Sequence, residues 1–396
     1  MILGASILQL PAIQKAKEMG LQVIAVDMNP DAIGFQEEGV IKEIISTIDT
    51  EKILEAAKKH KIDGIMTLAS DMPMRSVAIV AKEMGLVGIS EQTALNATNK
   101  AEMRQRLKEC GVPIPKFFRI SSKEEYEKAI HYFKTAQLKC IVKPADNSGS
   151  RGVDLLSDLS DDELVSKAYD YSKSYSRGGD VVVEEYMEGP EVSVETLSVD
   201  GECHIIQITD KLTTGAPYFV EMGHSEPSAL QEDVKTNISE VASAAVKALG
   251  IINGPSHTEI KVTKDGPKIV ELGARLGGDN ITTHLVPLST GVDMVECCIK
   301  IALGEKPDMA KKFSMGSAIR YLKADIGVIK EISGVEIADN MRGIKQISIV
   351  HDVGEHSKEI KSSVDRIGFV ITQDKTVEEA IEDCKLAMDK IVVKVG

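Results

Sequence analysis

One short stretch of the chain concentrates side chains that can do charge-based chemistry. The segment VELGARLGGDN, residues 270–280, brings Glu271, Arg275 and an aspartate together with three glycines. Apolar packing has no use for a carboxylate or a guanidinium, and glycine is a poor strand former. Carboxylates bind hard cations, arginine binds phosphate or carboxylate oxygens, and glycine leaves the backbone accessible. The stretch is therefore a candidate site for a metal ion and an anionic ligand.

The residues before and within this stretch predict a β-hairpin. HTEIKVTKDGPKIVEL, residues 257–272, reads as two strands joined at a three-residue Lys264-Asp265-Gly266 turn. Pairing the strands around Asp265 places Glu259 opposite Glu271. Strand residues two apart share a face, which predicts a polar face and a core face. The polar face would carry His257, Glu259, Lys261, Glu271 and Arg275, and the core face Ile260, Val262, Val270 and Leu272.

Two carboxylates directly opposite each other on a sheet repel, unless one takes up a proton or a cation lies between them. Mg²⁺ usually takes one or two carboxylates together with substrate phosphates. Glu259 and Glu271 are therefore candidate metal ligands. The alternative is a solvated outer face on which the two glutamates pair with Lys261 and Arg275.

A second segment, VKPADNSGSRGV, is a candidate phosphate loop. It puts Lys143 at the end of a strand, before a loop with Ser148, Gly149, Ser150 and Gly152. Glycine lets backbone N–H groups approach phosphate oxygens closely, and runs of such amides bind anions. The loop is not a Walker A loop, because it lacks the Gly-Lys-Ser/Thr ending. A flexible surface loop is the alternative interpretation.

A third segment, VEEYMEGPEVSV, suits a flat heterocycle. Apolar residues are followed by Glu184, Glu185, Tyr186 and Met187, and then by Glu191 beyond a Gly-Pro pair. An extended segment of this kind offers backbone groups beside apolar side chains, and the later carboxylate could accept both hydroxyls of a ribose. The alternative is a plain strand with a Gly-Pro bend.

In this order, the segments resemble the ATP-grasp superfamily over most of the chain. The landmarks are Lys100, IVKP, NSGSRGV, VEEYMEGPE, HTEIKV and VELGARLGG. The resemblance implies ATP and Mg²⁺ (or Mn²⁺) as cofactors. One departure stands out: the family usually has asparagine two residues after the second metal-binding glutamate, where this chain has Gly273. Weakened metal binding is therefore an open alternative.

The resemblance also assigns roles to individual residues. Lys100 and Lys143 would bind the ATP phosphates, with the glycine-rich loop at about 148–152 closing over them. Residues 184–187 would carry adenine and Glu191 the ribose. Glu259 and Glu271 would bind metal. Arg275 would steady the transferring phosphoryl group, so that Arg275 and Lys143 are the candidate catalytic residues.

Members of this superfamily generally make an acyl phosphate from a carboxylate and ATP, and an amine or thiol then displaces phosphate. Phosphoryl transfer depends on positioning and charge neutralisation, so no Ser-His-Asp or Cys-His constellation is needed. GPSHTEIKV and TTGAPYFVEMGHSEPSAL are similar to L-amino-acid ligases and their carbamoyl-phosphate-synthase-like relatives. Small-molecule carboxylate and amine substrates are therefore expected. The candidate substrate residues are Glu221, His224, Ser228, His257, Gly277 and Gly278.

Three other functions remain open. Phosphoribosylamine–glycine ligases share the architecture. A nucleotide-binding protein without catalysis is suggested by Gly273. A dinucleotide-dependent oxidoreductase is suggested by LGAS after a strand and by Asp27 at the end of the next, but Gly4-Ala5-Ser6 lacks the second glycine and Gln9 stands where the third would be. Asp27 is therefore interpreted as a strand-end residue.

Composition bounds the partners and the compartment. A net charge of -14 argues against a nucleic-acid partner, and no apolar run reaches the roughly 18 residues of a membrane span. The start, MILGASILQL, has no charged region before its apolar run and is a poor signal peptide. Six scattered cysteines without a CxxC predict reduced thiols in a cytoplasmic protein. A homodimer is left open.

The elements that must position these residues predict an α/β fold class, and the resemblance implies its α+β ATP-grasp type. Residues 1–97 would form an N-terminal parallel-sheet domain, with strands at QVIAVD, DGIMTLAS and GLVGIS separated by helices. Residues 98–306 would form a two-lobed ATP-grasp domain with a lid at about 117–187. Residues 307–396 would form a small C-terminal α+β domain.

Overall fold

The N-terminal region contains the predicted parallel sheet. The computed structural model describes every residue of the chain except 148 and 150. Its first three strands, β1 (Ile2–Leu3), β2 (Ile24–Val26) and β3 (Ile41–Glu43), pair in parallel. The carboxylate of Asp27 accepts from the backbone N–H groups of Ala5 and Asn29 at 2.8 and 2.9 Å, which agrees with its interpretation as a strand-end residue.

Two predicted strands of this region are shorter or missing. DGIMTLAS forms only isolated parallel bridges, from Met66 to Ile2 and from Leu68 to Leu276. GLVGIS forms no strand in the described chain, because it follows the Gly85 end of a helix and leads directly into the next helix cap at Ser90. The helices of this region are α1 (Leu10–Glu18), the 3-10 turn η1 (Ile33–Gln36), α2 (Thr50–His60), α3 (Met74–Met84) and α4 (Glu91–Thr98).

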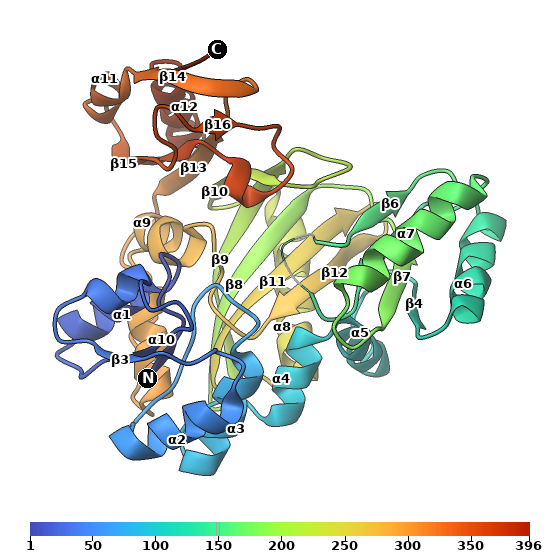
Figure 1. The fold of residues 1–396 in the computed structure, drawn as a ribbon, viewed down its shortest axis with the longest axis horizontal. Helices are drawn as coiled ribbons and strands as arrows, with labels where there is room; N and C mark the ends of the chain where they lie inside the picture. Colours follow the sequence, from blue (N-terminus) through green and yellow to red (C-terminus); the bar gives the residue numbers. More distant parts are fainter. Residues whose placement is uncertain (148, 150) are drawn as a thin grey trace.

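A four-stranded antiparallel sheet forms in the segment predicted to be the lid, residues 117–187. Its order is β4-β7-β5-β6, with bounds Phe117–Ile120 (β4), Cys140–Pro144 (β5), Asp154–Leu156 (β6) and Val181–Glu185 (β7). Two helices, α6 (Lys123–Thr135) and α7 (Asp162–Tyr175), contribute apolar side chains to its own core, including Phe133 and Tyr169. Figure 1 shows this lid at the right, with the blue N-terminal region on the other side of the central sheet.

An eight-stranded antiparallel sheet forms the centre of the molecule (Figure 1). Its order is β12-β11-β8-β9-β10-β13-β17-β15, so the pairing of β10 with β13 carries it past residue 306 into the C-terminal region. Its strands are β8 (Glu191–Val199), β9 (Glu202–Thr213), β10 (Glu221–Glu226), β11 (Gly254–Thr263), β12 (Gly266–Gly273), β13 (Gly316–Leu322), β15 (Ile344–Ile349) and β17 (Gly368–Asp374).

The remaining elements cover this sheet and extend the C-terminal region. A small sheet has the order β16-β14-β18, with bounds His356–Ser357 (β16), Gly327–Ser333 (β14) and Val392–Val395 (β18). The helices are α5 (Lys100–Glu109), α8 (Glu232–Leu249), the π-turn η2 (Ile281–Leu285), α9 (Val286–Thr290), α10 (Met294–Ala302), α11 (Val335–Asp339), the 3-10 turn η3 (Ser363–Asp365) and α12 (Val377–Met388). In the described part of the chain, every helix is too short or too polar to cross a membrane.

One acidic side chain is enclosed in the central sheet. Glu226 on β10 is fully buried and accepts hydrogen bonds from the hydroxyls of Thr209 and Ser289, both at 2.8 Å. Burial raises the pKa of Glu226 from 4.5 to about 8, and the nearby Glu195 carboxylate adds to the rise, while the two hydroxyls and Lys311 oppose it. The folded protein therefore holds Glu226 mostly neutral at pH 7.

Replacing Glu226 with glutamine should make stability less dependent on pH. The stabilisation from neutral Glu226 is complete below its unfolded pKa near 4.5 and is lost as the pH rises to about 8, because the unfolded chain releases the proton more readily. We expect the free energy of unfolding of Glu226→Gln, relative to wild type, to grow by up to about 4 kcal/mol between pH 5 and pH 8. Urea unfolding at four pH values measures this difference. A difference that does not change with pH would contradict the assignment.

Candidate active site

The predicted carboxylate pair faces across the hairpin, although the pairing near the turn differs from the predicted register. Strands β11 and β12 pair antiparallel, with Glu259 directly opposite Glu271. The turn is tighter than predicted, because Thr263 already pairs with Gly266 and only two residues, 264 and 265, form the loop. The central feature of the hairpin prediction, the facing carboxylates, is confirmed.

The prediction of the core face is wrong for one residue, Val270. The register shifts between Glu259 and Ile260, so that Ile260 pairs with Ile269 and Val270 is the extra residue of a β-bulge. Ile260, Ile269 and Leu272 are fully buried, whereas Val270 is only partly buried. The strict alternation assumed from the sequence fails at this point, because a bulge adds one residue to one strand and re-aims the side chains beside it.

A lysine from another element contacts each carboxylate. Lys100 Nζ lies 2.7 Å from Glu271 Oε1, and Lys211 Nζ lies 2.9 Å from Glu259 Oε1. Asn99 caps α5 by accepting from two backbone N–H groups, which fixes Lys100 at the first residue of the helix. The repulsion between the facing carboxylates is thus offset by two ammonium groups.

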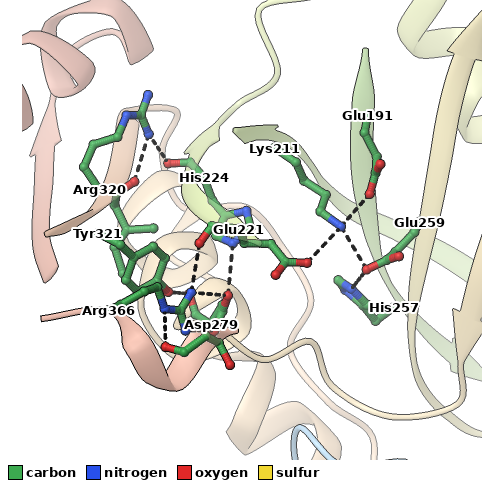
Figure 2. Close-up of polar contacts among 12 residues, drawn as sticks. Glu191, Lys211, Glu221, His224, His257, Glu259, Asp279, Arg320, Tyr321 and Arg366 are labelled. Carbon is green, nitrogen blue, oxygen red and sulfur yellow. Dashed lines mark hydrogen bonds and ion pairs between the residues drawn. The ribbon is translucent and has the colours of Figure 1, made fainter. Parts of the chain in front are cut away.

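Lys211, on β9, is a site residue that the sequence did not identify. Figure 2 shows its ammonium between the carboxylates of Glu191 (2.7 Å), Glu259 (2.9 Å) and Glu221 (3.6 Å). Burial opposes the charge, but the three carboxylates raise the pKa of Lys211 well above 10.5. The sequence pointed to Lys211 only indirectly. Glu191, Glu221 and Glu259 were all predicted near the ligands, and three neighbouring carboxylates need a cation, but no motif indicates which strand provides it.

The candidate catalytic Lys143 is tied to one of the predicted adenine residues. Lys143 and Glu184 are both buried and hydrogen-bonded to each other. Arg104 Nε donates to Glu184 at 2.9 Å, and its Nη2 donates to the carbonyl of Val270 at 2.7 Å. Although burial opposes ionisation, Arg104 and Lys143 lower the pKa of Glu184 to about 2. Arg104 lies one helical turn after Lys100, a spacing that could have pointed to it.

Its side-chain partners make Glu184 a structural residue, whatever its backbone binds. Glu184→Gln would leave two buried cations without their carboxylate, so we expect a loss of about 3–5 kcal/mol in the free energy of unfolding. The neighbouring Glu185→Gln is the control, because Glu185 is only partly buried and its basic neighbour Lys268 is 3.9 Å away. Its cost should stay below about 1 kcal/mol by urea unfolding. Equal costs for the two variants would contradict this assignment.

The glycine-rich loop is described only in part. Ser148 and Ser150 lie outside the described residues. Gly149 and Gly152 have positive φ angles of 68° and 78°, and a Cβ on Gly152 would come within 2.8 Å of Tyr175 Cβ. The carbonyl of Asn147 accepts from Lys100 Nζ at 2.7 Å, which connects the start of the loop to the carboxylate pair. Phosphate binding by this loop stays a prediction.

The predicted adenine segment runs from β7 toward β8. The backbone N–H groups of Glu185 and Tyr186 already donate to the carbonyls of Lys116 and Lys139, at 2.8 and 3.0 Å. Met187 is buried. Beyond the bend, Glu191 contacts Lys211 at 2.7 Å, and Lys261 at 3.1 Å. The nucleotide roles of these residues stay predictions.

Two of the candidate substrate residues, His257 and Gly277, lie at a buried ion pair that His257 forms with Glu195. His257 Nδ1 lies 2.6 Å from Glu195 Oε1, and its Nε2 lies 3.5 Å from Glu259. Burial opposes protonation, but Glu195 raises the pKa of His257 to about 9. A Cβ on Gly277 would lie 2.7 Å from His257 Nδ1, so this glycine makes room for the pair. Glu195 is a second residue that the sequence did not identify.

A second polar cluster joins the stretch at residues 270–280 to the C-terminal region (Figure 2). Arg366 donates to both carboxylate oxygens of Asp279 at 2.9 Å and lies over the Tyr321 ring at 3.7 Å. It also donates to the backbone carbonyl of Glu221 at 3.2 Å, while His224 Nε2 lies 3.6 Å from Asp279. The candidates Glu221 and His224 thus lie together, between Lys211 and Arg366.

The last two substrate candidates, Ser228 and Gly278, contact residues outside this cluster. Ser228 Oγ donates to Asp210 at 2.5 Å, a contact that orders the backbone after β10. A Cβ on Gly278 would lie 3.4 Å from Ala69 Cβ, so this glycine faces the N-terminal region. Arg275 also faces that region and pairs with Asp71. Substrate roles for Ser228 and Gly278 stay predictions.

Comparison with known proteins agrees with this geometry. An ATP-grasp domain family matches residues 136–283, and the L-amino acid ligase C-terminal domain 2 matches residues 320–396. The chain therefore contains an ATP-grasp domain. Several of its relatives are named ligases, among them an L-amino acid ligase and a phosphoribosylamine–glycine ligase.

Two curated relatives of this ATP-grasp chain are ligases. Alanine–anticapsin ligase of Bacillus subtilis is 29% identical over 303 residues, covering 71% of this chain and 62% of the relative. This chain thus spans less than two thirds of that enzyme. Phosphoribosylamine–glycine ligase of Methanocaldococcus jannaschii is 27% identical over 396 residues, covering 93% of this chain and 87% of the relative.

Solved structures show the same fold. The L-amino acid ligase from Bacillus licheniformis superposes with a TM-score of 0.83 at 23% identity, covering 100% of this chain and 98% of that one. The biotin carboxylase domain of the Hydrogenobacter thermophilus 2-oxoglutarate carboxylase, solved as a dimer with MgADP and bicarbonate, gives a TM-score of 0.78 at 19% identity, covering 99% and 90%.

The residues of this ATP-grasp chain fit a magnesium–nucleotide group. The facing carboxylates of Glu259 and Glu271 are hard oxygen donors, and the two ammonium groups beside them show that the site favours positive charge. Among the described residues, no group of three or more His, Cys, Asp or Glu side chains is placed to hold a metal ion. The chain would thus supply two carboxylates, and the other ligands would come from phosphate and water, as is usual for Mg²⁺.

Proposed function

We propose that this ATP-grasp protein is an ATP- and Mg²⁺-dependent ligase that joins a carboxylate to an amine. The reaction would run through an acyl phosphate, release ADP and phosphate, and use amino-acid-like substrates. The observation that carries the proposal is the contact of two ammonium groups, those of Lys100 and Lys211, with the facing carboxylates of Glu271 and Glu259. Arg275 follows four residues after Glu271 and is held by Asp71. Phosphoryl transfer needs this kind of preorganised charge.

The chain's own residues have separate roles in this reaction. Lys100 and Lys143 would hold the phosphates, and Arg275 would neutralise the negative charge that develops on the transferring phosphoryl group. A magnesium ion, when bound, would offset the phosphate charge from the side of Glu259 and Glu271. Lys211 would keep Glu191, Glu221 and Glu259 in fixed positions. The geometry thus provides orientation and charge, which is what this chemistry asks of a protein.

The similarity to L-amino acid ligases supports amino-acid-like substrates. The match to the L-amino acid ligase C-terminal domain covers Tyr321 and Arg366, which lie beside Glu221 and His224. We place the amine substrate near this cluster. Cytoplasmic location and a homodimer stay predictions.

A phosphoribosylamine–glycine ligase is the second candidate, favoured by the match to the Methanocaldococcus relative over 93% of this chain. Phosphate release measured over a matrix of amino acids, with phosphoribosylamine plus glycine as one well, distinguishes the two. Turnover confined to that well would replace the main proposal with the second.

Isotope transfer tests the chemistry of the main proposal. The carboxylate oxygen attacks the γ-phosphorus, so a substrate carboxylate labelled with ¹⁸O should deliver one labelled oxygen to the released phosphate. Glu271→Gln should lower turnover by on the order of 10²-fold or more, as the loss of a charged group at a phosphoryl-transfer site commonly does. Asp265→Asn, at the exposed turn of the same hairpin, is the matched control and should keep the wild-type rate. Label in AMP instead of phosphate would rule out the acyl phosphate.

A further inference from the structure

Gly273 is surrounded by side chains that leave no room for another. A Cβ at this position would lie 2.8 Å from Asp71 Oδ1 and 3.2 Å from Arg275 Nε. Gly273 is not among the glycines with a positive φ angle, so the backbone conformation does not require glycine. Glycine is therefore needed at residue 273 for lack of space, because the Asp71 side chain occupies the place that a Cβ would take.

Asp71 reaches this position from the N-terminal region and holds Arg275 at two points. Arg275 Nε donates to Asp71 Oδ1 at 2.9 Å, and Nη2 donates to Oδ2 at 3.2 Å. Both side chains are only 16% exposed. Although burial opposes the charge, Asp71 raises the pKa of Arg275, with smaller contributions from Glu271 and Glu259. A two-point contact of this kind fixes the plane of the guanidinium.

The loop that carries Asp71 is itself held against residues 270–280 by backbone contacts. Leu68 and Leu276 form a parallel bridge, and the N–H of Ala69 donates to the carbonyl of Leu276 at 3.3 Å. The backbone carbonyl of Asp71 accepts from Met74 N at 3.1 Å at the start of α3. The position of Asp71 relative to Arg275 is thus set by main-chain contacts on both sides.

This contact leaves part of the guanidinium available. Arginine has five N–H groups. Two donate to Asp71 and one, on Nη1, donates to the carbonyl of Leu276 at 3.3 Å. Among the described residues no further acceptor is hydrogen-bonded to Arg275, so the two others remain for an anionic ligand.

From these contacts we propose that Asp71 is a positioning residue for Arg275. Gly273 leaves the space that the Asp71 carboxylate occupies. The inference rests on the proposed function. In it, the N-terminal region supplies a carboxylate that orients Arg275 toward the transferring phosphoryl group. A side chain at residue 273 would displace that carboxylate. The glycine is therefore part of a working site and is not a sign of lost activity.

A thermal-unfolding cycle tests the shared volume without any need for turnover. The variants are Gly273→Ala, Asp71→Ala and the double variant. With Asp71 present, the new methyl group must push Asp71 and Arg275 apart, and we expect the Tm to fall by about 3 °C or more. In the Asp71→Ala background the methyl group meets only the flexible end of Arg275, and we expect a further change below about 1 °C. Gly278→Ala, whose Cβ would make an ordinary 3.4 Å contact, is the control for stability.

Kinetics test the positioning itself. Asp71→Ala should lower kcat by on the order of 10²-fold, because a small misplacement of a charge-stabilising group is costly, while ADP affinity stays within about threefold. The proposal is overturned by an equal effect of Gly273→Ala in both backgrounds, by no effect in either, or by an unchanged kcat in Asp71→Ala. A wild-type protein that turns over no substrate overturns the proposed function instead, and the unfolding cycle still decides the role of Asp71.

Discussion

Two carboxylates face each other across neighbouring strands, and much of the molecule is arranged to offset their repulsion. Lys100 comes from the first turn of α5, and Lys211 from the middle of the central sheet. Neither lysine is close to Glu259 or Glu271 in the sequence, so the site exists only once α5 and the central sheet have come together. Both cations also make a further contact, since Lys100 binds the start of the glycine-rich loop and Lys211 joins Glu191 and Glu221.

Buried charged side chains near the carboxylate pair are likewise paired with groups of opposite charge. Glu184 is held by Lys143 and Arg104, and His257 by Glu195. Burying an ionised group is tolerated only when a partner of opposite charge is within hydrogen-bonding distance. These pairs are therefore expected to fix side-chain positions more than to add net stability, which suits a site that needs rigid orientation.

The sequence predicted the local parts of this arrangement well. Strand alternation around a turn predicted the facing of Glu259 and Glu271, but in the structure the turn is one residue shorter than predicted and the bulge at Val270 restores the facing. The bulge at Val270 was not predictable from that alternation, because it depends on packing against the neighbouring core. The short lid strands and the continuation of the central sheet into β13 and β17 likewise depend on pairing between distant segments.

The residues missed in the sequence are those whose partners lie far away along the chain. Asp71 and Arg275 are 204 residues apart, and Arg366 reaches Asp279 across 87 residues. Asp71 follows the segment DGIMTLAS, where the carboxyl end of a predicted parallel strand is a common place for binding residues. For Arg366 no such signal exists.

Binding of Mn²⁺, followed by electron paramagnetic resonance, tests the central claim most directly. If the facing carboxylates form the metal site together with nucleotide, wild-type protein should bind Mn²⁺ tightly only when ADP is present, and Glu259→Gln should lose most of that nucleotide-dependent binding. Equal Mn²⁺ binding by wild type and Glu259→Gln in the presence of ADP would contradict the account.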